Sequence, residues 1–335
     1  MTETTNNKRM IWLLCGGLLA LSGTLSEGVV ASESGSYGDI GAGVARIDYP
    51  DSQFFAERGE AAPFTRNYNL DTDEGVAYGA AIDGRIGTFL PGTIANADSA
   101  RVELQGFWMS ADRNTNRSFS DTGAGMRFGW VELDNSTGFG TPNGGTLTTR
   151  IEQDLKYWGA DLMFLLDYGI GLDASWSFQV GPSFKRLDQD SDAAGAISTT
   201  VSLQDRLSTD FRGLRIGARY DRNLNLDWSV AMDGSVSRYW TKADYNGSYA
   251  DSSPNTQTAS LSDSDNALGL DLRLELNRKL GKGMKLSVFG QVNHLSDVPQ
   301  VSYGSVPTDT GNGVLSLTSD DMTTLVLGVE ISGSF

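Results

Sequence analysis

The chain contains one histidine, His294, and a serine follows two positions later at Ser296. In a β-strand, residues i and i+2 point to the same face, so an imidazole at 294 can reach a hydroxyl at 296. A histidine that removes the proton of a serine makes that oxygen a nucleophile for acyl transfer. The adjacent carboxylates Asp320 and Asp321 form a second candidate pair. The single histidine excludes every metal site that needs several histidine ligands.

The spacing of His294 and Ser296 is similar to that in outer-membrane phospholipase A, where a histidine and a serine two positions apart act on lipid. The resemblance implies a lipid hydrolase that works on the outer face of a barrel. The sequence shows no asparagine on an adjacent strand that would orient His294. A lipid hydrolase is therefore our third hypothesis, and we expect the protein not to be an enzyme.

The segments that must position these residues show period-two alternation, which is typical of β-strands. In the clearest one, Leu268, Leu270, Leu272, Leu274 and Leu276 alternate with Gly269, Asp271, Arg273 and Glu275. Alternation places the five leucines on one face, and such a face needs no cover if it faces lipid. The mean hydropathy of -0.26 agrees with a membrane barrel, because apolar lipid-facing residues and polar lumen-facing residues average out.

The alternation predicts an all-β fold, a transmembrane antiparallel up-and-down β-barrel of ten strands. The predicted strands are 36–49, 74–88, 100–111, 147–166, 172–186, 201–220, 226–241, 267–277, 284–295 and 322–335. Long and short connections alternate between them, which is typical of long extracellular loops and short periplasmic turns. Because Met126, Phe128 and Trp130 alternate inside the longest connection, twelve strands are the alternative.

Two features depart from a simple strand pattern. The apolar face changes parity near Trp158 and near Leu214, which predicts β-bulges or strands that extend beyond the bilayer. Pro182 cannot donate to a strand ladder, and we expect it at the outer rim of the barrel. Ten-stranded omptin proteases resemble the chain in strand count and long outer loops, and they use an Asp–His pair and an Asp pair. Asp320–Asp321 is an Asp pair, but the sequence places no histidine on a facing strand.

The two ends of the chain indicate export to a Gram-negative outer membrane. Lys8 and Arg9 precede an apolar run that ends at Leu21, and a small-residue site follows, so residues 1–31 are a predicted signal peptide and 32–335 the barrel. Cys15 is the only cysteine and lies in that segment, so the mature chain can form neither a disulfide nor a thiolate metal site. The last strand ends at Phe335 and resembles the terminal strand that the barrel assembly machinery recognises.

Charge excludes one class of partner and predicts the contents of the lumen. A formal net charge of -16 is unsuited to binding nucleic acid, whose phosphates need basic patches. We expect no cofactor, and outer-membrane lipids with lipopolysaccharide are the expected partners. The acidic loops could bind divalent cations that bridge them to lipopolysaccharide, but no loop has EF-hand spacing and a solvated acidic surface is the favoured interpretation. The polar parity places these charges inside the barrel: Asp83, Arg85, Arg101, Glu103, Asp161, Asp173, Lys185, Arg215, Arg219, Asp227, Asp233, Asp271, Arg273, Glu275, Lys285 and Glu330.

The region 150–240 resembles the Legionella-type pore-forming major outer membrane protein family. The resemblance is carried by Tyr157–Leu162, Val180–Asp188 and Phe211–Gly217. It implies a pore and carries over no site residue. Small side chains at inward positions, such as Ser175 and Ser177, leave space for water, so a narrow porin-like channel for ions or small solutes is our first hypothesis. The alternative is a non-conducting structural or adhesive barrel that acts through acidic extracellular loops.

Overall fold

The computed structural model describes residues 35–48, 55–58, 67–69, 76–92, 94–120, 126–128, 131–133, 146–171, 173–196, 200–251, 256–281, 283–303 and 315–335. The predicted signal peptide, residues 1–31, lies outside these ranges. In the described part of the chain, no helix is long and apolar enough to cross a membrane.

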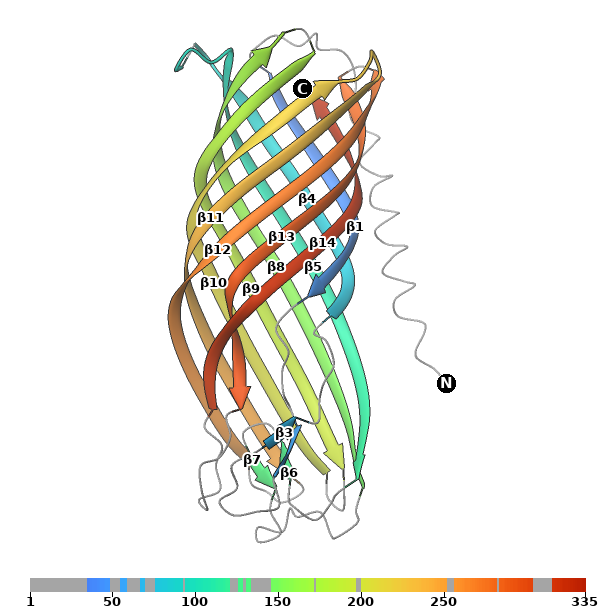
Figure 1. The fold of residues 1–335 in the computed structure, drawn as a ribbon, viewed down its shortest axis with the longest axis vertical. Helices are drawn as coiled ribbons and strands as arrows, with labels where there is room; N and C mark the ends of the chain where they lie inside the picture. Colours follow the sequence, from blue (N-terminus) through green and yellow to red (C-terminus); the bar gives the residue numbers. More distant parts are fainter. Residues whose placement is uncertain are drawn as a thin grey trace.

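Ten antiparallel strands form a closed barrel, as predicted (Figure 1). Each strand pairs with its neighbours along the chain, and β1 closes the ring by pairing with β14. At the closure, Ser36 and Phe335 exchange two backbone hydrogen bonds of 3.0 and 2.8 Å. The barrel strands are β1 (Ser36–Asp48), β4 (Val76–Leu90), β5 (Ser99–Ser120), β8 (Thr146–Ile170), β9 (Ala174–Ala196), β10 (Thr200–Asn223), β11 (Trp228–Asp251), β12 (Thr256–Gly281), β13 (Met284–Tyr303) and β14 (Leu315–Ser334).

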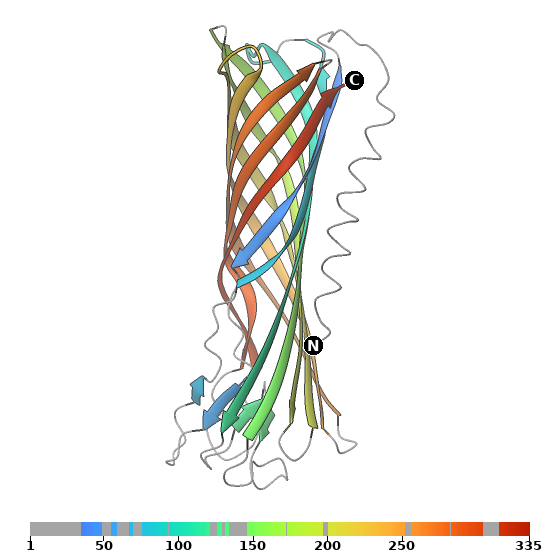
Figure 2. The same ribbon diagram turned by 90° about the vertical axis from the view of Figure 1, so that its right-hand side faces the viewer.

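The alternative of twelve barrel strands is wrong. β6 (Met126–Phe128) and β7 (Val131–Leu133) form a hairpin, but it joins β2 (Phe55–Arg58) and β3 (Asn67–Asn69) in a separate four-stranded sheet. This sheet lies at the end of the barrel opposite to the C-terminus (Figure 2). The alternation at 126–130 therefore indicated a real hairpin that the closed barrel does not include.

Eight strands are much longer than a bilayer requires. β5 and β8 to β14 have 20 to 26 residues, whereas a spanning strand needs about 9–11. The excess lies at the extracellular end, so the predicted long connections 187–200 and 242–266 are wrong. β9 runs to Ala196 and β12 begins at Thr256. Beyond the lipid the outer face of a strand meets water and becomes polar, so these extensions have no apolar lipid-facing residues to mark them as strands.

The same extension explains both parity changes. The pairings of β8 with β9 and of β9 with β10 contain no register shift, so there is no bulge near Trp158 or Leu214. Apolar residues face outward in the membrane band and inward above it. Leu162 is 50% exposed, whereas Leu155 on the same strand is 3% exposed. Pro182 lies between the lipid-facing residues Val180 and Phe184, within the band and not at its rim as predicted.

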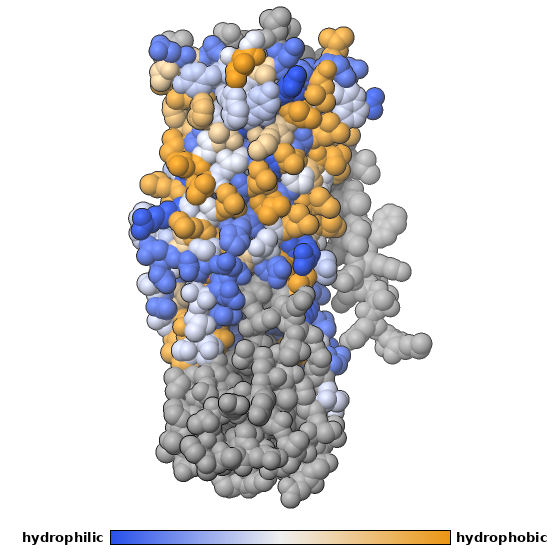
Figure 3. All heavy atoms as spheres, in the orientation of Figure 1, coloured by the Kyte–Doolittle hydropathy of each residue, from blue (hydrophilic) through white to orange (hydrophobic). Residues whose placement is uncertain are grey.

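The outer surface is divided into two zones. On the face shown in Figure 3, apolar side chains gather over the half of the barrel nearer the C-terminus, and polar side chains lie directly beyond them. Trp158, Trp176, Trp228 and Trp240 are on the outside and at least 36% exposed. Such a band, flanked by aromatic residues, is the surface of a membrane-spanning β-barrel.

Candidate functional site in the barrel lumen

The periplasmic half of the lumen is a polar vestibule of about 780 Å³. Small residues on inward positions, such as Ser175, Ser177 and Ser229, leave this space open. The turns at its mouth are tight, and Gly281 and Gly283 adopt φ values of +89° and +76° in the turn between β12 and β13. Only glycine adopts such values at little cost.

Two arginines at the inner end of the vestibule bind carboxylates from several strands. Arg85 Nε donates to Asp39 Oδ2 at 2.8 Å, and its terminal nitrogen lies 3.1 Å from Glu330 Oε2. Arg273 binds Asp83 at 2.8 Å and also binds Glu330. Oxygens of Asp39, Asp83 and Glu330 lie within 4.8 Å of one another. Because the two guanidinium groups already neutralise these acids, the cluster is a poor fit for a metal cation.

Further ion pairs join strands around the vestibule. Those of Arg215 and Arg219 bridge strands that are not adjacent, and that of Arg101 joins the adjacent strands β5 and β8. Arg215 contacts Asp161 at 2.5 Å. Arg219 contacts Glu275 at 2.7 Å. Arg101 contacts Asp167 at 2.9 Å. The vestibule charges are therefore paired between strands, which holds their side chains in place.

The structure places most predicted lumen charges inside the barrel. Asp83, Arg85, Arg101, Glu103, Asp161, Lys185, Arg215, Arg219, Asp233, Asp271, Arg273, Glu275 and Glu330 belong to strands and point inward, while Asp173 and Lys285 line the mouth of the vestibule. The prediction that Asp227 faces the lumen is wrong. It is exposed in the turn before β11, where its carbonyl accepts a hydrogen bond from the backbone of Lys279. β11 begins at Trp228, two residues later than the predicted strand 226–241.

The sequence analysis missed several inward carboxylates, among them Asp39, Asp167 and Asp221, which line the vestibule. Asp39 binds Arg85, and Asp167 binds Arg101. Asp39 lies in a glycine-rich strand, where the weak alternation of apolar residues hides the parity. Asp167 follows the apolar run Met163–Leu166, whose continuous hydrophobicity hides it as well. Ile40 and Val44 are apolar and occupy the same face of this strand, so their spacing could have placed Asp39 on the opposite, inward face.

Lys185 marks the inner boundary of the polar region. Its ammonium is 3.6 Å from Asp271 Oδ1, and its side chain is 3% exposed. The rings of Phe107, Tyr157 and Tyr239 surround it, with centroids 5.4 to 5.9 Å away. This combination of one carboxylate and three aromatic faces replaces water around the buried cation.

Beyond Lys185, a layer of buried, mainly apolar side chains crosses the lumen, with the buried polar residues Thr324 and Asn293 next to it. Each of the ten barrel strands contributes at least one side chain to it. Tyr157, Phe211 and Tyr239 are 0% exposed, so water does not reach the centre of the layer. Its members are Ala45, Ile47, Ala77, Ala81, Met109, Ala111, Leu155, Tyr157, Leu187, Phe211, Tyr239, Ala267, Phe289, Leu295, Val298, Met322 and Val326.

The candidate catalytic pair does not assemble. His294 Nδ1 lies 3.1 Å from Thr323 Oγ1, and its Nε2 lies 3.7 Å from Asp321 on β14. The expectation that no histidine faces the Asp320–Asp321 pair is therefore wrong. Ser296 Oγ instead donates to Asp297 at 2.6 Å and accepts from the backbone N–H of Leu268. Both imidazole nitrogens thus face β14, and neither is the base for Ser296.

Comparisons with known proteins assign the chain to no family. No family model matches the chain. No curated protein matches it either. Among solved structures, the outer membrane protease OmpT of Escherichia coli is 13% identical, with 92% of this chain and 99% of that chain covered and a TM-score of 0.46. The CymD monoaromatic hydrocarbon channel is 8% identical, with 91% and 89% covered and a TM-score of 0.35.

A third similar structure is a major outer membrane protein of Thermus thermophilus, which is 12% identical, with 90% of this chain and 99% of that chain covered and a TM-score of 0.31. The resemblance to the Legionella-type family is untested by these matches and stays a prediction. The barrel itself supports the coarser conclusion. The chain folds as a closed, ten-stranded, antiparallel barrel with an apolar outer band, which is the architecture of outer-membrane β-barrels.

Proposed function

We propose that the protein is a non-conducting barrel of the outer membrane. It acts through the parts of the strands that extend beyond the apolar band on the extracellular side, such as 242–251 of β11, which together we call the extracellular wall. The observation that carries this proposal is the apolar layer, to which all ten barrel strands contribute. Ions and polar solutes lose their hydration when they enter such a layer, and none of its described side chains carries a charge that compensates for that loss. No catalytic role is assigned to any residue.

The extracellular wall supports the second half of the proposal. On β11 the outward residues Lys242, Asp244 and Asn246 are exposed and polar, while the inward residues Ala243 and Tyr245 are buried. Outside the membrane band, the hydrogen bonds from Lys242 and Ser262 lower the pKa of Asp244, so that its carboxylate stays charged. The wall therefore offers an exposed, charged surface beyond the membrane band.

Solute flux into liposomes tests the proposal. Liposomes that contain the folded barrel should swell in arabinose no faster than empty liposomes. A variant with the layer opened, Phe211→Ala with Tyr239→Ala, should increase swelling and would show that the assay detects a passage through this lumen. Swelling by the wild-type barrel at a rate similar to that of the variant would contradict the proposal.

A narrow channel is the second candidate, and the vestibule favours it. A space of about 780 Å³ opens on the periplasmic side, and the charges that line it would select among ions. Conduction then requires the apolar layer to move aside. If the wild-type barrel conducts only under an applied voltage, this candidate replaces the first.

A further inference from the structure

A ring of side chains on the outside of the barrel marks the level at which the apolar band ends. On each strand we take the first polar residue that faces outward on the extracellular side of the lipid-facing residues. On four consecutive strands, β8 to β11, this residue is basic: Lys156, Arg186, Arg212 and Arg238. On the other strands it is Arg46, Tyr78, Ser110, Asn266, His294 or Thr323.

The strand register brings the four basic residues close together. Arg186 lies opposite Trp158, two residues from Lys156 on the same face. Arg212 lies opposite Trp240, two residues from Arg238. Each base is thus the diagonal neighbour of the next, at a Cα separation of about 7–8 Å. With Asp188 and Asp210 these four bases form what we call the rim patch.

The rim patch is positive in a strongly acidic protein. Arg186 contacts Asp188 at 3.0 Å and Asp210 at 3.4 Å, and Arg212 contacts Asp210 at 3.1 Å. Four bases against two acids leave the patch two positive charges, whereas the chain as a whole carries -16. The Arg212 side chain is 72% exposed despite its ion pair, so most of its N–H groups face outward.

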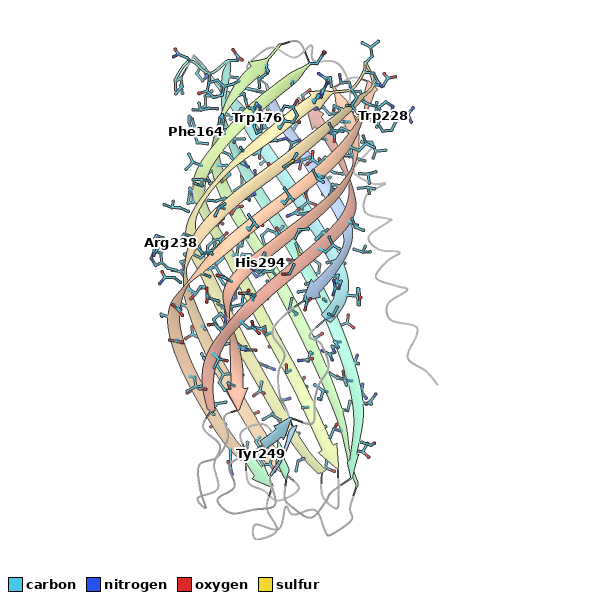
Figure 4. The ribbon with its side chains drawn as sticks, in the orientation of Figure 1. Phe164, Trp176, Trp228, Arg238, Tyr249 and His294 are labelled. Carbon is cyan, nitrogen blue, oxygen red and sulfur yellow. The ribbon has the colours of Figure 1, made fainter. Side chains whose placement is uncertain are left out.

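Arg238 is the least compensated base of the patch. It forms no ion pair with any residue that the structure describes, and its Cα partners are Leu214 and Leu268, which are 56% and 57% exposed. Its side chain projects from the edge of the barrel, at the level of His294 (Figure 4). A guanidinium between two lipid-facing leucines lies at the boundary of the hydrocarbon, where lipid phosphates are its natural counter-ions.

We propose that the rim patch binds the phosphate groups of a phosphorylated glycolipid headgroup in the outer leaflet. The guanidinium groups supply paired N–H donors that match phosphate oxygens. The exposed apolar side chains directly below, including Leu214 and Ile216, provide the surface for the acyl chains of the same molecule. The exposed ring of Trp240 lies beside Arg212 at headgroup level, where amphipathic rings are favoured.

Binding of defined lipids to the full barrel in detergent micelles tests the proposal. The probes are bis-phosphorylated lipid A, the same lipid with both phosphates removed, and inorganic phosphate, each measured by native mass spectrometry and calorimetry. The variant is Arg186→Gln, Arg212→Gln and Arg238→Gln together. The matched control is Arg46→Gln, because Arg46 lies at the same level on the other side of the ring, beside Asp48 at 3.6 Å.

We expect the wild type and Arg46→Gln to bind lipid A equally, and the triple variant to bind it at least about tenfold more weakly. Removal of the phosphates should weaken binding to the wild type by a similar factor. Equal binding by the triple variant, or equal binding of the dephosphorylated lipid, would overturn the proposal. Inorganic phosphate that competes at the affinity of the lipid would also overturn it, since the patch would then be a site for free phosphate. Heat-modifiable gel mobility verifies that each variant is folded.

Discussion

The ammonium of Lys185 is held by one acid and three aromatic rings at the boundary between the vestibule and the apolar layer. A charge at this depth is stable only while its partner is present, because an unpaired ion in such surroundings loses its hydration without compensation. Asp271 therefore matters more for the stability of the barrel than any exposed acid on the extracellular wall.

Replacement of Asp271 by Asn should lower the free energy of unfolding by about 3–5 kcal/mol, because it leaves the Lys185 cation buried without an acid. The double variant Lys185→Met with Asp271→Asn should recover most of that loss. Urea unfolding, followed by the gel mobility of the folded barrel, measures both effects. The control is Lys242→Met, whose partner Asp244 is exposed and which should leave the unfolding midpoint unchanged. A double variant as unstable as Asp271→Asn alone would contradict this description of the site.

Single side chains show how far the sequence predicts the lumen. Inward charges such as Arg85, Arg273 and Glu330 follow from strand parity alone. Their partners do not, because parity assigns a face but not which side chains meet across ten strands. The rim bases were missed for another reason. Arg186, Arg212 and Arg238 lie within the predicted strands, but on the outward face, which was searched for lipid-facing apolar residues and not for charges.

At the scale of elements, the extracellular wall is split. The strand pairing of β12 with β13 ends at Gly269 and Leu295, so the backbone of the segment from Thr256 to Leu268 pairs with β11 alone. Three backbone N–H groups on the unpaired edge of this segment donate hydrogen bonds to side chains. The N–H of Ser264 donates to Asp263, that of Asn266 to Asp265 and that of Leu268 to Ser296. Charged and capped edges of this kind resist pairing with another chain.

The double variant Asp263→Ala with Asp265→Ala should remove two of these caps. Hydrogen exchange of the amides of Ser264 and Asn266 should then accelerate by about tenfold, which corresponds to the loss of one hydrogen bond. Mass spectrometry of the peptide that contains them measures the change. Asp244→Ala, on the neighbouring strand, is the control. Unchanged protection in the double variant would show that another group holds these amides.

The backbones of the paired strands β8 and β9 lie in close contact at Gly181. A Cβ added to Gly181 would overlap the carbonyl oxygen of Leu162, whereas one added to Gly106 would lie 3.7 Å from its nearest neighbour. We therefore expect Gly181→Ala to lower the free energy of unfolding by about 1–3 kcal/mol. Gly106→Ala should leave it nearly unchanged, and urea unfolding distinguishes the two. Equal stability of both variants would show that this contact relaxes freely.

The elements were predicted from sequence to different degrees. Lipid-facing segments such as Leu268–Leu276 were placed correctly, because lipid on one face and polar groups on the other impose alternation. The extensions were taken for loops, since Lys242, Asp244 and Asn246 carry no apolar outward pattern. The inward residues Ala243 and Tyr245 are apolar and alternate with these polar residues. That inward alternation was the signal that could have identified the extension as a strand.

At the scale of the whole molecule, three zones lie along one axis. A charged vestibule opens at the periplasmic end, an apolar layer closes the middle, and a tall polar wall rises on the extracellular side. Strand number alone does not distinguish a closed barrel from an open one at this size, since the contents of the lumen decide. Here the vestibule is open, and buried side chains of the layer occupy the middle of the lumen.

Single-molecule current across a planar bilayer tests most directly whether the lumen is closed. The folded wild-type barrel is inserted into the bilayer. The double variant Phe211→Ala with Tyr239→Ala, inserted by the same procedure, should produce discrete current steps and so verifies that the procedure inserts barrels. For the wild type we predict no steps above the bare membrane at low voltage. Discrete, reproducible steps from the wild-type barrel, of the same size as those of the variant, would contradict the closed lumen and establish a pore.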